Sequence, residues 1–181
     1  MSTMTALSEL TGDYVLDTAH TRIGFIARHT MATRVWGQFE EFEGSAHLDG
    51  DEPSKSSAQL SIQAKSIQTR NEQRDVQLGS RFLNADDHPA ITFTSIGMDQ
   101  VGKTTFKVAG DLTIRGVTET VIVDFELTGT ERDRLGYLRV TFRGSATISR
   151  RDWGVNWNAA TSVLVGRKVT LELDVAAIRQ S

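Results

Sequence analysis

The sequence contains no cysteine, which excludes disulfide bridges, a thiolate nucleophile and cysteine metal ligands. It also has no apolar run near the ~18 residues that a membrane-spanning helix requires. The first residues, MSTMTALSELTGDYVL, show neither the basic start nor the apolar run of a secretory signal. We therefore expect a cytoplasmic protein without a transmembrane segment, stabilised by packing alone.

A strong charge of one sign is missing as well. Lys and Arg number 20 against 23 Asp and Glu, a net charge of -3, and the basic residues are scattered among acidic ones. Such a chain does not attract phosphate backbones, which argues against a nucleic acid partner. With 181 residues and 39% hydrophobic content the chain can bury one core. We predict a flexible N-terminal segment over residues 1–12 and a single domain over 13–181.

What the sequence does have is alternation of apolar and polar residues with period two, typical of strands with one buried face. The alternation recurs in eight segments, at residues 22–29, 35–48, 58–64, 91–95, 106–114, 121–127, 138–148 and 169–175. It shifts phase after Glu40, where we expect a β-bulge. Most connections are short and rich in Gly and Asp, which indicates antiparallel neighbours.

Closing such a meander removes its two exposed edges. The sequence therefore predicts a mainly β fold, an eight-stranded antiparallel up-and-down barrel of lipocalin-like form, wide enough for one elongated ligand. A two-sheet sandwich is the alternative. Glycines within the strands, namely Gly24, Gly37, Gly110 and Gly144, fit bends of a closed sheet or backbone that lies close to a ligand.

One connection, between the third and fourth strands, is much longer than a hairpin needs. It contains NEQRDVQLGS, rich in helix formers, with Asn71 as N-cap and Gly79 near the helix end. A long connection with its own helix predicts a flap over one mouth of the barrel. Phe82 and Leu83 would be its apolar plug, with Phe82 pointing into the pore.

The arginines of the flap have two interpretations. Arg74 and Arg81 would lie at the polar entrance, where a guanidinium can donate two hydrogen bonds to a ligand headgroup. Alternatively, both pair on the surface with Asp75, Asp86 or Asp87.

Motifs of catalysis are weak or misplaced. GMDQVGKT, residues 97–104, matches the phosphate-binding pattern, but the strand-like TFKVAGDLTI follows it where a helix is required, so we predict a hairpin turn. The histidines have no metal-ligand spacing, and no G-x-S-x-G elbow occurs. SRRDWGVNWN, residues 149–158, fits either a stacking or anion-binding site or a packed corner that closes the barrel.

Several segments in order resemble the YceI-like family of bacterial polyisoprenoid-binding proteins. The resemblance covers about residues 13 to 178 and is carried by YVLDTAHTRIGFIARH, VWGQFEEFEG, AKSIQTRNEQRDVQLGSRFLNADDHPAITF, VAGDLTIRGVTETVIV, RRDWGV and VGRKVTLELDVAAI. It implies a lipocalin-like barrel whose apolar pore holds a polyprenyl chain or isoprenoid quinone. The implied function is non-catalytic binding, transport or storage of that lipid, with no cofactor besides it and a homodimer as a possible assembly.

The predicted site follows from the resemblance and the strand pattern together. The pore would be lined by Ile23, Phe25, Phe39, Leu60, Ile62, Phe82, Phe93, Leu112, Val123, Phe125, Val140, Phe142, Trp153 and Trp157. The headgroup would be met by His29, Arg74, Arg81 and Arg151.

Two alternatives stay open. One is a metal-assisted enzyme acting on an isoprenoid or another amphiphilic lipid, with a metal at His29 or His88. The other is a barrel with a small ligand or none, its interior filled by Phe25, Phe39, Phe93, Phe125 and Phe142.

Overall fold

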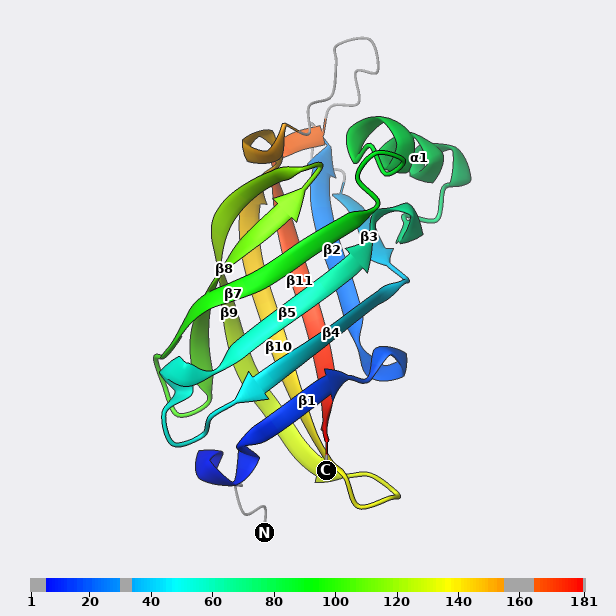
Figure 1. The fold of residues 1–181 in the computed structure, drawn as a ribbon. Helices are drawn as coiled ribbons and strands as arrows, with labels where there is room; N and C mark the ends of the chain where they lie inside the picture. Colours follow the sequence, from blue (N-terminus) through cyan, green and yellow to red (C-terminus); the bar gives the residue numbers. More distant parts are fainter. Residues whose placement is uncertain (1–5, 30–33, 155–164, 181) are drawn as a thin grey trace.

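The computed structural model describes residues 6–29, 34–154 and 165–180. In this part of the chain eleven strands form one antiparallel sheet, which curves into a closed barrel (Figure 1). The strands are β1 (Gly12–Leu16), β2 (Arg22–His29), β3 (Arg34–Phe39), β4 (Phe42–Leu48), β5 (Ser57–Gln63), β6 (Ile67–Gln68), β7 (Ala90–Gln100), β8 (Thr105–Ile114), β9 (Val117–Arg132), β10 (Leu138–Ser149) and β11 (Val165–Arg179).

The eleven strands occupy eight positions around the barrel, which we call walls. Five walls are single strands, and three consist of two strands placed end to end. β11 pairs with β2 along residues 165–174 and with β1 along 177–179, so β1 and β2 are two parts of one wall. β3 and β4 form the next wall, pairing with β2 and β1 respectively, and β6 and β5 form the third. The predicted eight-stranded antiparallel barrel is confirmed, and the pairing of β1 with β11 excludes the open sandwich.

The predicted bulge after Glu40 is wrong. The chain breaks there, and β3 ends at Phe39 before β4 begins at Phe42. The two strands pair with different partners, so the phase shift in the sequence marks a gap between strands. A break lets the wall change direction, which a closed sheet of tilted strands requires.

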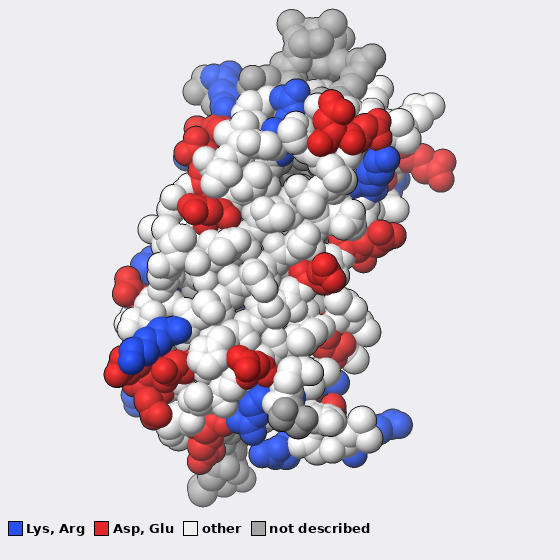
Figure 2. Space-filling view, in the orientation of Figure 1, with Lys and Arg blue, Asp and Glu red and all other residues white. Residues whose placement is uncertain are grey.

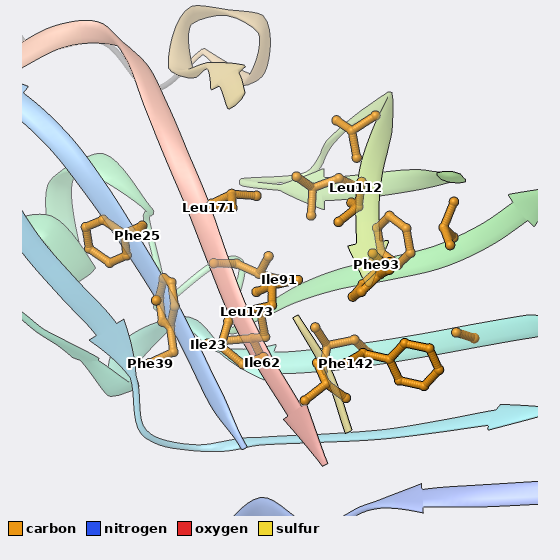
Figure 3. Close-up of a pocket in the computed structure, with 18 of the residues that line it drawn as sticks. Ile23, Phe25, Phe39, Ile62, Ile91, Phe93, Leu112, Phe142, Leu171 and Leu173 are labelled. Atoms are coloured by element: carbon orange, nitrogen blue, oxygen red, sulfur yellow. The ribbon is translucent and has the colours of Figure 1, made fainter. Parts of the chain in front are cut away.

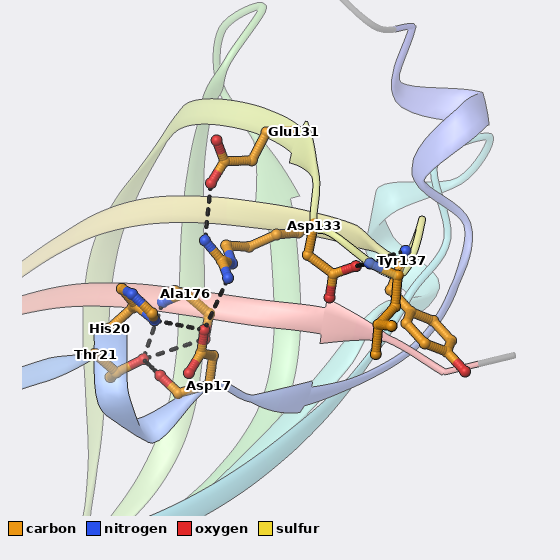
Figure 4. A network of polar contacts seen from close by, with 9 residues as sticks. Asp17, His20, Thr21, Glu131, Asp133, Tyr137 and Ala176 are labelled. Carbon is orange, nitrogen blue, oxygen red and sulfur yellow. Dashed lines mark hydrogen bonds and ion pairs between the residues drawn. The ribbon is translucent and has the colours of Figure 1, made fainter.

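Between β1 and β2 the chain forms the short 3-10 helix η2 (Thr18–His20), and a network of polar contacts holds this segment in place (Figure 4). Asp17 Oδ2 lies 2.8 Å from His20 Nδ1 and 3.4 Å from a guanidinium nitrogen of Arg139 in β10. Arg139 also pairs with Glu131 of β9 at 2.9 Å. The Thr21 hydroxyl donates to the carbonyl oxygens of Asp17 and of Ala176 in β11. The segment is thereby tied to three other walls.

Short helical segments lie at the two ends of the barrel (Figure 1). At one end are α1 (Glu72–Gln77), the π-helical turn η5 (Leu78–Phe82) and η6 (Arg150–Trp153). At the other is η1 (Leu7–Leu10), which together with the start of β1 occupies part of the segment predicted to be flexible. Among the described residues, none of these helices has the length and apolar character needed to cross a bilayer.

The predicted flap helix is present with its predicted N-cap. Asn71 Oδ1 accepts a hydrogen bond of 3.0 Å from the Arg74 backbone N–H. The helix does not end at Gly79, because a π-helical turn continues it to Phe82 and the Leu83 N–H donates to the Leu78 carbonyl at 2.8 Å. This extension carries Phe82 to a buried position.

The phosphate-loop match is a hairpin turn, as predicted. Val101 N–H donates to the Thr105 carbonyl at 2.9 Å. Residues 97–100 end β7, and residues 101–104 connect it directly to β8. On the face drawn in Figure 2, acidic and basic side chains are interspersed at both ends without forming a basic stripe.

Trp153 closes the corner between η6 and the barrel. Its side chain is only 2% exposed, and its indole N–H donates to the Leu112 carbonyl of β8 at 2.8 Å. Arg115, in the turn after β8, donates to the Gly154 carbonyl at 2.6 Å. Trp153 is therefore part of a packed corner, whereas Trp157 lies outside the described residues.

This corner yields a stability prediction. Trp153→Ala should lower the free energy of unfolding by about 3–5 kcal/mol through cavity formation. Trp153→Phe should lower it by about 1–3 kcal/mol, because the indole hydrogen bond is lost. Urea unfolding measures both, and Trp36→Ala is the control, since Trp36 is 52% exposed. Equal losses at positions 36 and 153 would contradict the packing described.

Candidate functional site

The barrel encloses a cavity of about 610 Å³ whose lining is mostly apolar. Figure 3 shows side chains of β2, β3, β5, β7, β8, β10 and β11 directed into it. Its walls combine two clusters of packed side chains. One surrounds Trp153 and Ile148, and the other surrounds Leu10 and Tyr14.

The predicted lining residues that the structure describes come from the inner faces of the strands and, for Phe82 and Trp153, from η5 and η6. All of them line this cavity: Ile23, Phe25, Phe39, Leu60, Ile62, Phe82, Phe93, Leu112, Val123, Phe125, Val140, Phe142 and Trp153. Phe82 reaches it from η5, so the flap supplies an apolar side chain to the interior. Contact of these residues with a ligand stays a prediction.

The phenylalanines do not fill the interior, because three of their rings pack on glycines of the neighbouring strand. A Cβ added to Gly37, Gly110 or Gly144 would overlap the ring of Phe25, Phe93 or Phe125 respectively. Each ring thus lies against the wall, and the space beside it stays open. Three of the four glycines predicted to mark bends or a ligand contact thus receive rings, whereas a Cβ at Gly24 would meet the Arg22 guanidinium.

The mouth beside α1 is rimmed by polar side chains. Asn71, Gln73, Arg74 and Gln77 of this segment line the cavity, as does Arg150 of η6. Gln73 and Gln77 are exposed, and their amides make no hydrogen bond within the part of the chain that the structure describes. These amides are therefore available to a ligand at the rim.

Arg74 is held in place by the chain itself. Its Nε donates to Thr69 Oγ1 and its Nη2 to the Thr69 carbonyl, both at 2.8 Å. Asp75 accepts from the Thr69 backbone N–H at 2.9 Å. The alternative that Arg74 pairs with an aspartate is wrong. Asp86 pairs instead with Lys65 at 2.8 Å, and this hydrogen bond lowers the pKa of the Asp86 carboxyl.

Of the other predicted headgroup residues, the structure describes the side chain of Arg151 alone. Arg151 is exposed and does not line the cavity, whereas its neighbour Arg150 does, because the short turn of η6 directs adjacent side chains differently. His29 ends β2, and its side chain, like that of Arg81, lies outside the description. Among the described residues, no group of three His, Asp or Glu side chains is placed to hold a metal.

Sequence reasoning predicted the flap and Arg74 at one mouth of the cavity, but it missed the rim glutamines and the opposite end. The rim glutamines carry no motif, and their position depends on how α1 docks. At the opposite end, Leu7, Leu10 and Tyr14 line the cavity. Burial raises the pKa of the Tyr14 hydroxyl, which donates to the Leu10 carbonyl at 2.7 Å. The apolar residues of LSELTGDYVL were the available signal for this end.

Comparison with known proteins gives consistent matches along the whole chain. The family model of the YceI-like domain matches residues 14–177. A UPF0312 protein of Pseudomonas paraeruginosa is 32% identical over 179 residues, covering 97% of this chain and 92% of the relative.

Solved structures share the fold. The crystal structure of Burkholderia cenocepacia BcnA is similar with a TM-score of 0.80 at 23% identity, covering 89% of this chain and 98% of that one. A domain from Saccharophagus degradans, described as polyisoprenoid binding and implicated in plant cell wall breakdown, has a TM-score of 0.72 at 16% identity. The match covers 92% of this chain and 98% of that domain. At these identities the likeness establishes the fold alone.

The ring-on-glycine packing yields a second prediction. Gly110→Ala places a methyl group against the Phe93 ring, and the displaced ring should reduce the cavity and cost about 1–3 kcal/mol of unfolding free energy. Gly97→Ala is the matched control on β7, because a Cβ there meets no atom within 4 Å. Denaturant unfolding of the two variants, with a crystal structure of the first, checks this. A ring that stays in place without a stability loss contradicts it.

Proposed function

The chain belongs to the YceI-like domain family, and from this premise we propose that it binds a long-chain isoprenoid lipid and carries or stores it without reaction. The lipid is a polyprenyl chain or an isoprenoid quinone. The observation that supports this most directly is the cavity, a preformed apolar space inside a closed wall. A linear apolar tail is the ligand that such a space accommodates.

The proportions of the cavity favour one extended chain. β10 has 12 residues. At ~3.3 Å per residue and a tilt of about 40°, it rises about 30 Å along the barrel axis. The cavity of about 610 Å³, distributed over that length, has a mean cross-section of roughly 20 Å². A single hydrocarbon chain in contact with its walls at about 3.5–4.0 Å needs about the same cross-section.

Burial of the tail supplies the affinity. At ~0.8 kcal/mol per buried methylene, an isoprene unit of five carbons gains up to about 4 kcal/mol. Association costs about 4–15 kcal/mol, so several units must be buried before binding is useful. The walls are already in place, which limits the ordering cost. These magnitudes favour a long tail over a short one.

The rim provides for a polar headgroup. Arg74, oriented by Thr69, and the amides of Gln73 and Gln77 lie on the α1 side of the mouth. Such donors suit a quinone carbonyl or a phosphate oxygen, and a guanidinium fixed by other bonds loses little freedom when it donates.

The proposal predicts specific lipid retention. Protein stripped of lipid, incubated with a long-tailed menaquinone and desalted, should retain about one molecule per chain by native mass spectrometry, in keeping with one chain per cavity. Organic extraction of the protein as purified should also yield an isoprenoid. If neither experiment recovers lipid, the proposed function is wrong.

A variant pair tests whether the flap closes on the ligand. Phe82→Asp places a carboxylate against an apolar cavity, where burial of the charge is costly, so lipid retention should fall at least about 10-fold. Val76→Asp is the matched control on the same flap, because Val76 is 67% exposed. Retention measured at unchanged circular dichroism should drop only for position 82. Equal retention by both variants means that Phe82 does not contact the lipid.

A further inference from the structure

We propose that the N-terminal turn η1 is the floor of the cavity and sets the length of the isoprenoid tail that the barrel buries. This inference rests on the proposed function and assigns tail-length specificity to the residues that close the lower end. It concerns a segment that the alternation of the strands does not cover.

The side chains of η1 form part of the cavity wall. Leu7 and Leu10 both line the cavity, and Leu10 is buried. Leu10 belongs to the cluster with Tyr14, Leu138 and Val140. A tail that enters from the mouth therefore meets apolar side chains of η1 when it reaches this end.

Hydrogen bonds from β1, β11 and the connection between β4 and β5 hold η1 and Thr11, the residue after it, against the barrel. Tyr14 of β1 donates its hydroxyl to the Leu10 carbonyl at 2.7 Å. Arg179 of β11 donates to the Glu9 carbonyl at 2.8 Å. The Gly50 N–H, in the connection between β4 and β5, donates to Thr11 Oγ1 at 2.9 Å. The carbonyl groups at the end of a short helix need such partners, and here the partners come from the barrel wall.

Direct backbone contact seals one side of the floor. A Cβ at Gly50 would overlap the carbonyl of Leu7 and the Cα of Ser8. The connection between β4 and β5 therefore lies against η1 with no room for a side chain at this position. Gly50 allows this close approach because it has no Cβ.

Asp49 and Ser56, two polar residues that line the cavity near the floor, accept hydrogen bonds from the chain itself. Asp49 Oδ1 accepts from the N–H groups of Asp51 and Glu52, and Ser56 Oγ accepts from the Asp49 N–H. At the mouth, the amides of Gln73 and Gln77 have no partner within the described residues. A polar headgroup therefore finds donors at the mouth, and the apolar end of the tail lies against the floor.

The length of the barrel sets the expected limit on the number of isoprene units that the cavity can bury. An isoprene unit adds four chain bonds of about 1.5 Å, or about 4–5 Å when extended. The barrel axis of about 30 Å thus holds about six or seven units. Units beyond this number must leave through the mouth into water.

The test uses menaquinones with two to ten isoprene units, supplied as an equimolar mixture in detergent micelles. The ratio of bound to supplied lipid is measured for each tail length by mass spectrometry. It should not fall with tail length until a limiting number of isoprene units is reached. It should then fall at least about 10-fold per unit, because each further unit leaves the micelle for water.

Two variants should move this limit in opposite directions. Leu10→Ala deepens the floor and should raise the limit by about one unit, since it removes several buried carbon atoms. Ala46→Phe fills the lower end, where Ala46 packs beside the Leu10 cluster, and should lower the limit by one unit or more. Ile96→Ala, on the exposed outer face of β7, is the control and should leave the limit unchanged.

The outcomes separate the two proposals. Opposite shifts in Leu10→Ala and Ala46→Phe support the floor, and Ala46→Phe alone decides if Leu10→Ala does not fold. If the wild-type protein retains tails but all variants share one limit, η1 is not the floor and the proposed function stands. If the wild-type protein retains no tail of any length, both proposals are overturned.

Discussion

Tyr14, Val15 and Leu16 of β1 pair with Arg179, Ile178 and Ala177 of β11, and this short ladder closes the sheet. An open sheet must cover its inner face by packing side chains against another layer. A closed one shields that face within its own curvature, while every wall has a hydrogen-bonded neighbour on both sides. A cavity of about 610 Å³ can persist because the backbone ladders hold the wall independently of what fills the interior.

The alternation predicted the walls because a residue that faces the interior is apolar whichever strand lies beside it. It therefore placed residues such as Phe93 and Phe125 on the inner face without knowing the pairing. It could not distinguish a bulge from a break at Glu40, since both shift the phase by one residue and the difference lies in distant partners. The role of β1 was equally hidden, because five residues carry little periodicity.

The open space inside the barrel depends on pairs of residues on neighbouring strands. Phe25 and Gly37 face each other in the register of β2 and β3, and so do Phe125 and Gly144 in β9 and β10. A side chain larger than hydrogen at either glycine would displace the ring toward the interior. Sequence reasoning identified the glycines and the rings separately, but only the strand register reveals that each glycine receives a ring.

The two ends of the cavity impose a direction on any amphiphilic ligand. At the η1 end, a polar headgroup would lie among Leu7, Leu10 and Tyr14. Asp49 and Ser56 nearby already hold hydrogen bonds within the chain, and burying a polar group without hydrogen bonds costs roughly 2–7 kcal/mol. At the α1 end, Gln73 and Gln77 keep their amides at the exposed rim. Since the walls between are apolar, reversing the ligand would lose the headgroup bonds without gaining burial of the tail. The lipid proposed above would therefore enter tail first through the mouth beside α1 and η6, with its polar end left beside the residues that can donate hydrogen bonds to it.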